Sequence, residues 1–177
     1  MHGIVFNQLQ QFVTKNHGIS TWKNLLRSAG LSHKMYMPTE IYPDQDIQAI
    51  VKTASEQLNV PAADILEDFG FYISEGMMRI YASSIKAEWK SLDLIEHTEN
   101  TMHKAVRHAD KNAMPPALTC QRIAHNKVQI LYNSERQMIE LGIGIIKGIG
   151  KYYNEKLLVS RSSTTGGDTL LEVTKIG

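Results

Sequence analysis

A histidine, a proline and a Tyr-x-Ser-x-Arg triplet follow one another in the second half of this sequence. His103 lies on the apolar side of a predicted helix, Pro116 comes thirteen residues later, and further along the chain stand Tyr132, Ser134 and Arg136. A buried imidazole can ligate iron, a proline can press on a flat macrocycle, and two hydroxyls with a guanidinium can hold two carboxylates. This combination is typical of a haem pocket.

Helical geometry selects His103 among the histidines of its segment. At 3.6 residues per turn, the apolar residues of the segment fall within an arc of about 120°, and His103 lies at the edge of that arc. His97 and His108 point roughly the opposite way. A lone histidine on an apolar face can also be an ordinary hydrogen-bonded core residue, so position alone leaves the ligand role open. The apolar residues are Leu92, Ile95, Met102, Val106 and Ala109.

The triplet has the right chemistry for binding carboxylates. Tyr132, Ser134 and Arg136 alternate, so at an extended strand end their side chains leave from one side. Ordinary explanations remain open: Ser134 can cap the next helix, Tyr132 can belong to the core, and Arg136 can be solvated. The pair Pro115-Pro116 can likewise serve only to end a helix before a strand.

Length and charge exclude several classes of function. At 177 residues the chain suits a single domain, 1–177, that can bury a core and an enclosed cofactor but not a separate output enzyme. A net charge of +1 excludes the positive excess of a nucleic-acid binder. Cys120 is the only cysteine, which excludes an internal disulfide and a multi-cysteine zinc or iron–sulfur site.

No membrane or export segment is predicted. The N-terminus lacks a basic segment followed by an apolar run, and Glu140 and Lys147 interrupt the longest apolar stretch, 139–150. We therefore expect a soluble, cytoplasmic protein with no membrane partner.

Before the prolines the sequence is helical. An apolar stripe predicts a first helix ended by Gly18, and Ser20 and Thr21 suit the N-cap of a second helix that stops at Gly30. Helical spacing then continues over three further segments, the last of which is expected to be one long helix bearing the candidate histidine. These segments cover residues 44–58, 62–78 and 83–109.

After the prolines the pattern predicts strands around one helix. Ser134 and Gln137 have the spacing of a capping box, which predicts a helix over 134–153. His125-Asn126 and Gly166-Gly167 suit the turns of two hairpins. The expected strands cover residues 117–123, 127–132, 156–161 and 169–176. The fold class is therefore α+β: a mainly helical part, 1–112, followed by a helix and a small, about four-stranded antiparallel sheet, 113–177, which together enclose haem.

The glycine-rich stretch 142–150 is not a phosphate loop, because neither nucleotide-binding glycine pattern fits it. Gly144 and Gly148 share one helical face, which favours close packing against a sheet or a flat ligand.

With these pieces assembled, the chain resembles the haem nitric oxide/oxygen-binding domain family, called H-NOX or HNOB. The resemblance covers essentially the whole length. It is carried by Met1-His2-Gly3-Ile4-Val5, Met102-His103, Met114-Pro115-Pro116-Ala117-Leu118, Tyr132-x-Ser134-x-Arg136 and Gly144-Ile145-Ile146-Lys147-Gly148.

The resemblance implies a role for each matching position. It implies haem b as the cofactor, with His103 as the proximal iron ligand, Pro116 as the residue that distorts the porphyrin, and the triplet as the propionate grip. The implied distal lining consists of Val5, Leu9, Ile73, Met77, Leu141 and Ile145.

The residue at position 141 implies which gas is bound. Members that hold oxygen place a tyrosine five residues after the signature arginine, where this chain has Leu141. Bound oxygen needs a hydrogen bond to persist, whereas bound nitric oxide is nearly neutral and needs none. The resemblance therefore implies a sensor for nitric oxide, with carbon monoxide as a second ligand, and not an enzyme.

The implied sensor acts on a separate signalling protein, such as a histidine kinase or a cyclic-di-nucleotide enzyme. Two alternatives belong to other classes. A histidine phosphotransfer protein would use His97 or His108 as an exposed phosphoacceptor in a helical bundle, against which the predicted strands argue. A peroxidase-type haem enzyme would need a distal acid–base pair, which the matched positions lack.

Overall fold

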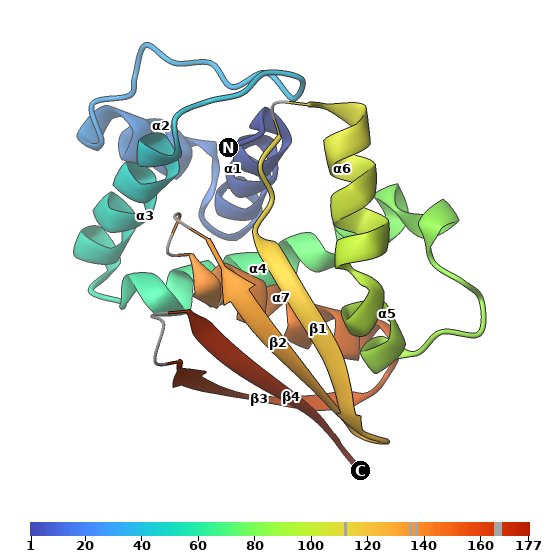
Figure 1. Ribbon diagram of the computed structural model, residues 1–177. Helices are drawn as coiled ribbons and strands as arrows, with labels where there is room; N and C mark the ends of the chain where they lie inside the picture. Colours follow the sequence, from blue (N-terminus) through green and yellow to red (C-terminus); the bar gives the residue numbers. More distant parts are fainter. Residues whose placement is uncertain (112, 135, 137, 165–167) are drawn as a thin grey trace. The chain divides into compact units, whose positions relative to one another are not determined.

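The computed structural model describes residues 1–111, 113–134, 136, 138–164 and 168–177 (Figure 1). It divides into two compact units, Met1–Phe69 and Gly70–Gly177, and the division falls within helix α4 (Ala62–Ile80). Within the described residues, none of the helices is long and apolar enough to cross a bilayer. A single domain over 1–177 stays a prediction.

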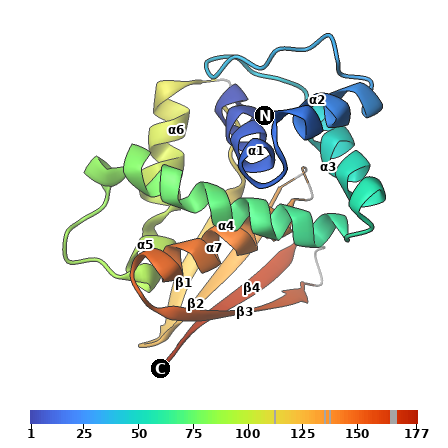
Figure 2. The same cartoon turned by 180° about the vertical axis from the view of Figure 1, so that it is seen from behind.

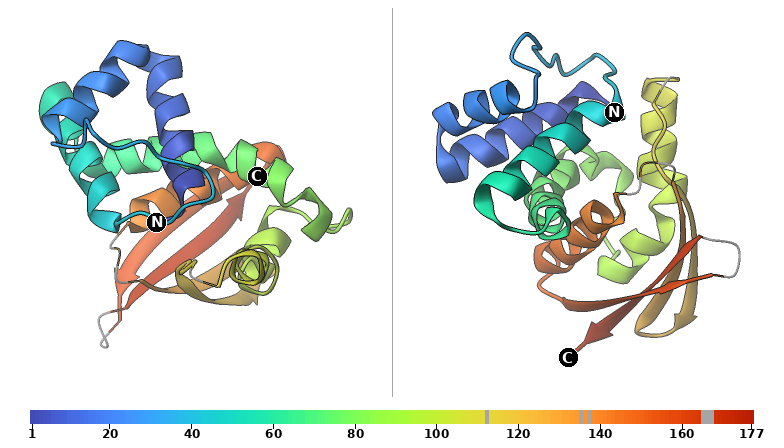
Figure 3. Two further views of the ribbon diagram at one scale, coloured as in Figure 1. Left: turned by 90° about the horizontal axis from the view of Figure 1, so that it is seen from above. Right: turned by 90° about the vertical axis from the view of Figure 1, so that its left-hand side faces the viewer.

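The first unit is helical. It contains α1 (Gly3–His17), α2 (Ile19–Ser28) and α3 (Asp44–Leu58), and α2 contacts both of the others, as the left view of Figure 3 shows. Gly18 joins α1 to α2 with φ at 83°, and its N–H still bonds to Thr14 of α1. The turn at Gly18 starts α2 at Ile19, so the predicted N-cap at Ser20 and Thr21 is wrong.

A buried carboxylate organises the core of the first unit. Asp46 is 6% exposed, accepts the Tyr36 hydroxyl at 3.0 Å, and pairs with Lys34 at 2.7 Å. The Tyr36 ring stacks on Phe6 with 4.1 Å between ring centroids. Burial and the bond to Asp46 raise the pKa of Tyr36, so its hydroxyl stays a donor. Every polar group in this cluster thus has a partner despite burial.

The second unit contains a four-stranded antiparallel sheet in the order β1-β2-β4-β3, and the predicted α+β fold is confirmed. The strands are β1 (Ala117–Ala124), β2 (Lys127–Asn133), β3 (Lys156–Ser163) and β4 (Thr169–Ile176). His125-Asn126 forms the predicted turn between β1 and β2. The second predicted turn, Gly166-Gly167, lies outside the described residues.

Helices α5 (Ser91–His97) and α7 (Ile139–Tyr152) cover one face of this sheet (Figures 2 and 3). The sheet contributes two cross-strand pairs to the core, Val128 with Val173 and Ile130 with Leu171. The helices contribute apolar residues that are at most 7% exposed. These are Leu92, Leu94, Ile95, Ile139, Ile146 and Ile149. Their burial supplies the main driving force for this unit.

Glycine lets α7 approach the second half of α4 closely (Figure 2). A Cβ placed on Gly148 would lie 2.0 Å from the Ser74 hydroxyl, and one on Gly70 would lie 2.1 Å from the Leu141 carbonyl. The expected close approach at Gly148 is therefore made to a helix, whereas the sequence suggested a sheet or a flat ligand.

The segment 83–109 is not the one long helix that the sequence predicts. A short 3₁₀ helix, Ala82–Ser84, is followed by non-helical chain up to α5, and after α5 come the π-helix η2 (Glu99–His103) and α6 (Lys104–Ala109). The Asp93 carboxylate accepts the backbone N–H of Lys90 at 2.9 Å, which fixes the start of α5. Local side-chain bonds of this kind override the helical periodicity.

The helix after the triplet also begins later than predicted. It starts at Ile139 with Met138 at its N-cap, so Ser134 does not cap it. The other half of the predicted capping box, Gln137, lies outside the described residues.

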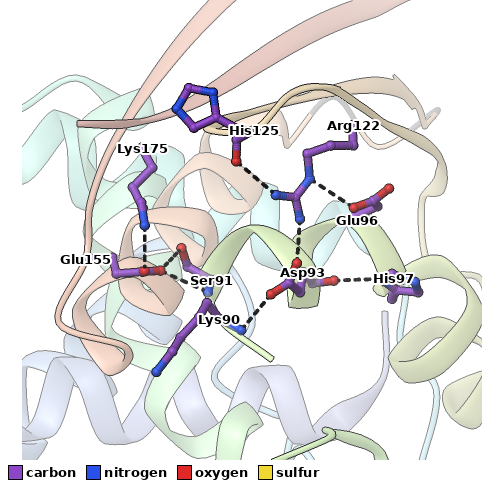
Figure 4. Close-up of polar contacts among 9 residues, drawn as sticks. All are labelled: Lys90, Ser91, Asp93, Glu96, His97, Arg122, His125, Glu155 and Lys175. Carbon is purple, nitrogen blue, oxygen red and sulfur yellow. Dashed lines mark hydrogen bonds and ion pairs between the residues drawn. The ribbon is translucent and has the colours of Figure 1, made fainter. Parts of the chain in front are cut away.

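Charged side chains fasten α5 to the sheet (Figure 4). Arg122 of β1 bonds to Asp93 at 2.7 Å and to Glu96 at 3.0 Å. At the start of α5, Glu155 accepts the backbone N–H of Ser91 at 3.1 Å and also its hydroxyl, and Ser91 is fully buried. A carboxylate at a helix N-terminus satisfies otherwise unpaired N–H groups.

We predict that Glu155→Gln lowers the free energy of unfolding at pH 7 by about 1–2 kcal/mol, because a charged acceptor is lost from a buried hydroxyl and a helix terminus. Burial disfavours the ionised form of Glu155, but hydrogen bonds from Ser91 and Lys175 outweigh it, so its pKa lies below the ordinary value. A lowered carboxyl pKa stabilises the fold above the unfolded-state pKa and loses this effect as pH falls.

The difference between wild type and Glu155→Gln should therefore shrink as pH falls from 6 toward 3 in urea titrations. Glu172→Gln is the matched control, since Glu172 pairs with Lys127 on the sheet surface at 2.8 Å. A pH-independent difference, or one no larger than the control's, would contradict this account.

Candidate functional site

The imidazole of His103 is largely buried and hydrogen-bonded to a carboxylate. Its side chain is 13% exposed, and its Nδ1 lies 2.9 Å from Oε2 of Glu99, one turn earlier. An ionised carboxylate only accepts, so Nδ1 carries the hydrogen and Nε2 has the lone pair. His97 and His108 are exposed, as the helical geometry predicts.

Burial and the neighbouring carboxylate act in opposite directions on this imidazole. Burial lowers the pKa of His103 below its ordinary value, although the hydrogen bond and charge of Glu99 oppose it. For Glu99, burial raises the pKa, but the hydrogen bonds from His103 and Arg107 outweigh it and the net shift is downward. The pair thus consists of a neutral imidazole and a carboxylate at neutral pH. A neutral imidazole is the form that binds a metal.

The backbone geometry at His103 is unusual. The residue ends the π-helix η2, and its N–H bonds to the Thr98 carbonyl, five residues earlier, at 3.1 Å. Single π-helical turns within α-helices are frequently found at functional sites. This turn is a backbone feature that no periodicity in the sequence signals.

Three contacts hold the segment 114–118 between the helix of His103 and the triplet. The N–H of Leu118 donates to Glu99 at 3.2 Å, and the Pro116 backbone lies close enough to the His103 ring to raise its pKa. From the other side, the Arg136 guanidinium donates to the Met114 carbonyl. The candidate ligand, the proline and the candidate carboxylate grip are therefore brought together within the second unit.

The side chains of the triplet come together through a turn after β2, so the predicted extended strand geometry is wrong. Strand β2 ends at Asn133, and Arg136 lies in a turn after it. The Arg136 N–H donates to the Ser134 hydroxyl at 3.3 Å, and the Tyr132 hydroxyl lies close enough to Ser134 for that residue to lower its pKa. The chain turns here because Ser134 bonds the backbone two residues on.

Burial raises the pKa of Tyr132, although Ser134 and Arg136 oppose it, so the hydroxyl stays protonated. Tyr132 also packs against the core of the sheet. The triplet thus offers two hydroxyls and a guanidinium in one place, which is chemistry suited to carboxylates.

The residues predicted to line a distal pocket fall in both units. Ile73 and Met77 lie on α4, and Leu141 and Ile145 lie on α7, which packs closely against it. Ile73 is 5% exposed, and the other three are half-buried. Val5, which is half-buried, and Leu9, which is buried, belong to α1 in the first unit. A lining formed by all six stays a prediction.

Sequence reasoning missed Glu99 and Arg107. The spacing of Glu99 and His103, four residues apart on a helix, is the signal that points to their contact. The lone Cys120 lies on β1 nearby, where burial and the charges of Glu99 and Glu96 raise its pKa to about 12. Its thiol is therefore protonated at neutral pH and a weak nucleophile.

The donor set fits haem. A neutral imidazole with one lone-pair nitrogen would suit haem iron, and a protonated hydroxyl with a guanidinium would suit the propionates. Both groups lie on elements joined through the segment 114–118.

Solved structures share this fold. An H-NOX protein from S. oneidensis in the Fe(II)NO ligation state matches with a TM-score of 0.92 at 20% identity, and the match covers 100% of both chains. The unliganded Fe(II) H-NOX protein from K. algicida matches with a TM-score of 0.90 at 16% identity, over 100% of this chain and 97% of that one. The fold is thus that of H-NOX proteins.

Sequence comparison gives the family. The haem-NO-binding family, HNOB, matches residues 2–161, and the chain belongs to this family. Soluble guanylate cyclase gcy-32 of Caenorhabditis elegans is 24% identical over 162 residues, which are 85% of this chain and 23% of the cyclase. The chain therefore spans about a quarter of the length of this relative.

Proposed function

We propose that this protein is a haem-based sensor that binds nitric oxide at ferrous iron and regulates a separate signalling protein. One observation carries the proposal: segment 114–118, which contains Pro116, contacts both Glu99, the hydrogen-bond partner of His103, and Arg136 of the triplet. Membership of the haem-NO-binding family supports the class of cofactor and ligand.

Each of these groups has a role toward the cofactor, which we propose to be haem b. His103 binds iron through Nε2, since Nδ1 is held by Glu99. Tyr132, Ser134 and Arg136 bind the propionates, and Pro116 presses on the porphyrin. When bound, ferrous haem supplies the iron to which a diatomic gas attaches.

The proposed distal pocket discriminates between gases because it lacks a hydrogen-bond donor. Val5, Leu9, Ile73, Met77, Leu141 and Ile145 are all apolar and form the proposed lining. Leu141 offers no hydrogen-bond donor at the position where oxygen-holding relatives have a tyrosine. Oxygen depends on such a donor, whereas nitric oxide and carbon monoxide do not.

Release of His103 from iron is the proposed signal. His103 would hold the iron, and loss of that bond when nitric oxide binds would free η2 and α6 from the cofactor. The change reaches a partner in trans, such as a histidine kinase or a cyclic-di-nucleotide enzyme, only if the partner binds the two states with different affinity. The chain itself acts as a sensor and not as an enzyme. A phosphotransfer bundle is disfavoured by the four-stranded sheet.

We expect His103→Gly to lose haem, or to retain it only when imidazole is added, because no other helical histidine is buried in the part of the chain that the structure describes. Absorption spectra of protein purified with haem measure this directly. His97→Ala and His108→Ala are the controls, and both should match wild type. An equal loss of haem in either control would refute the assignment of the ligand.

Leu141→Tyr should allow the ferrous protein to retain oxygen in air, because the new hydroxyl supplies the missing donor. Wild type should bind nitric oxide and carbon monoxide but not retain oxygen. Leu141→Phe, similar in size but without the hydroxyl, should behave as wild type. Spectra recorded over minutes in air decide the point, and oxygen retained by wild type would sink this explanation of selectivity.

Toward the partner, His103→Gly without imidazole should mimic wild type with nitric oxide, because both lack the bond between iron and the helix. The measurement is partner activity titrated with the variant and with wild type in the absence of gas, and with wild type after nitric oxide is added. If the variant acts like unliganded wild type, cleavage of that bond is not the switch.

A further inference from the structure

Glu99 is held from three directions beside the candidate iron ligand. Its Oε2 accepts Nδ1–H of His103 at 2.9 Å and the N–H of Leu118 at 3.2 Å. Its other oxygen, Oε1, pairs with Arg107. The Glu99 side chain is 25% exposed, so a carboxylate with both oxygens engaged has little freedom to turn away from the imidazole.

A carboxylate in this place changes what the imidazole does as a ligand. It fixes the tautomer in which Nε2 carries the lone pair, and it holds the ring in one orientation. Its negative charge also makes Nε2 a stronger electron donor than a neutral acceptor would. The strength of an axial ligand in turn affects the reduction potential of haem iron.

We propose, resting on the proposed function, that Glu99 is a positioning residue that orients His103 and strengthens its bond to iron. Arg107 moderates this effect, because the positive charge of its guanidinium partly neutralises the carboxylate. The carboxylate then makes Nε2 of His103 a weaker electron donor than it would alone. The strength of the bond between His103 and iron thus depends on a residue that contacts neither iron nor gas.

The two partners of this contact have opposite effects. Removing the charge of Glu99 makes Nε2 of His103 a weaker electron donor. Removing Arg107 leaves the negative charge of Glu99 less neutralised, which makes Nε2 a stronger electron donor. Damage to packing would push both variants in the same direction. The sign of the change therefore separates electronic tuning from a merely structural role.

The test uses the ferrous holoprotein without gas, in which resonance Raman spectroscopy gives the iron–histidine stretching frequency and electrochemistry gives the midpoint potential. Glu99→Gln should lower the frequency and raise the potential, and Arg107→Ala should shift both the other way. Glu99→Ala should weaken haem binding by about 10- to 100-fold, the usual cost of losing such a partner. Glu96→Gln is the matched control, since Glu96 pairs with Arg122 and should leave both values unchanged.

The proposal is overturned if Glu99→Gln matches wild type, or if it shifts in the same direction as Arg107→Ala. Should Glu99→Gln not fold, Arg107→Ala decides alone: its side chain is 42% exposed, and an unchanged frequency overturns the proposal. Failure of the proposed function looks different. In that case wild type shows no iron–histidine frequency, and His103→Gly has the spectrum of wild type.

Discussion

A buried imidazole donor must have an acceptor, because leaving one unpaired costs about 1–3 kcal/mol. Glu99 supplies the acceptor for His103, but a half-buried carboxylate needs partners of its own. Arg107 and the Leu118 N–H provide them. One buried ring therefore dictates contacts that reach from η2 to α6 and to the start of β1. Burial keeps the imidazole neutral although Glu99 opposes this, and the bond to Glu99 leaves Nε2 with the lone pair, so the contacts that satisfy the buried ring also suit the proposed role of His103 as an iron ligand.

The helices that carry these residues are too short to be stable alone. Helix α5 has 7 residues, η2 has 5 and α6 has 6, whereas isolated helices below about 12 residues are marginal in water. Their positions depend on tertiary contacts, namely the apolar face of α5 against the sheet and the polar bonds of Arg122 and Glu155. The polar bonds hold α5. The π-helix η2 is held by the buried side chain of Met102 and by the bond of Glu99 to Leu118, and α6 pairs with Glu99 through Arg107.

Side-chain chemistry and periodicity suffice to predict the α+β fold, the four strands and the inward position of His103. The strands follow from alternation and turn residues, which are local signals. The break in 83–109 and the π-turn do not follow, because Asp93 and the Thr98 carbonyl impose them through specific bonds. The triplet was expected to gather on a strand, but it gathers in a turn, because the Ser134 hydroxyl bonds the backbone of Arg136. Glu99 could have been found from its spacing to His103, whereas its bond to Leu118 depends on how the helix meets the sheet.

The contacts of segment 114–118 determine which parts of the second unit a movement of His103 can affect. Glu99 bonds to Leu118 at the start of β1, and β1 is an edge strand of the sheet that, within the described residues, pairs with β2. An edge strand can shift by breaking the hydrogen bonds to one neighbouring strand. A shift of β4, which lies between β2 and β3, would break the hydrogen bonds to two. On the proposed function, release of His103 should therefore alter α6 and the start of β1 before it alters the opposite edge at β3. A partner that contacts only β3 would bind both states alike and receive no signal. The binding surface of the partner must then include α6 or the segment that leads into β1.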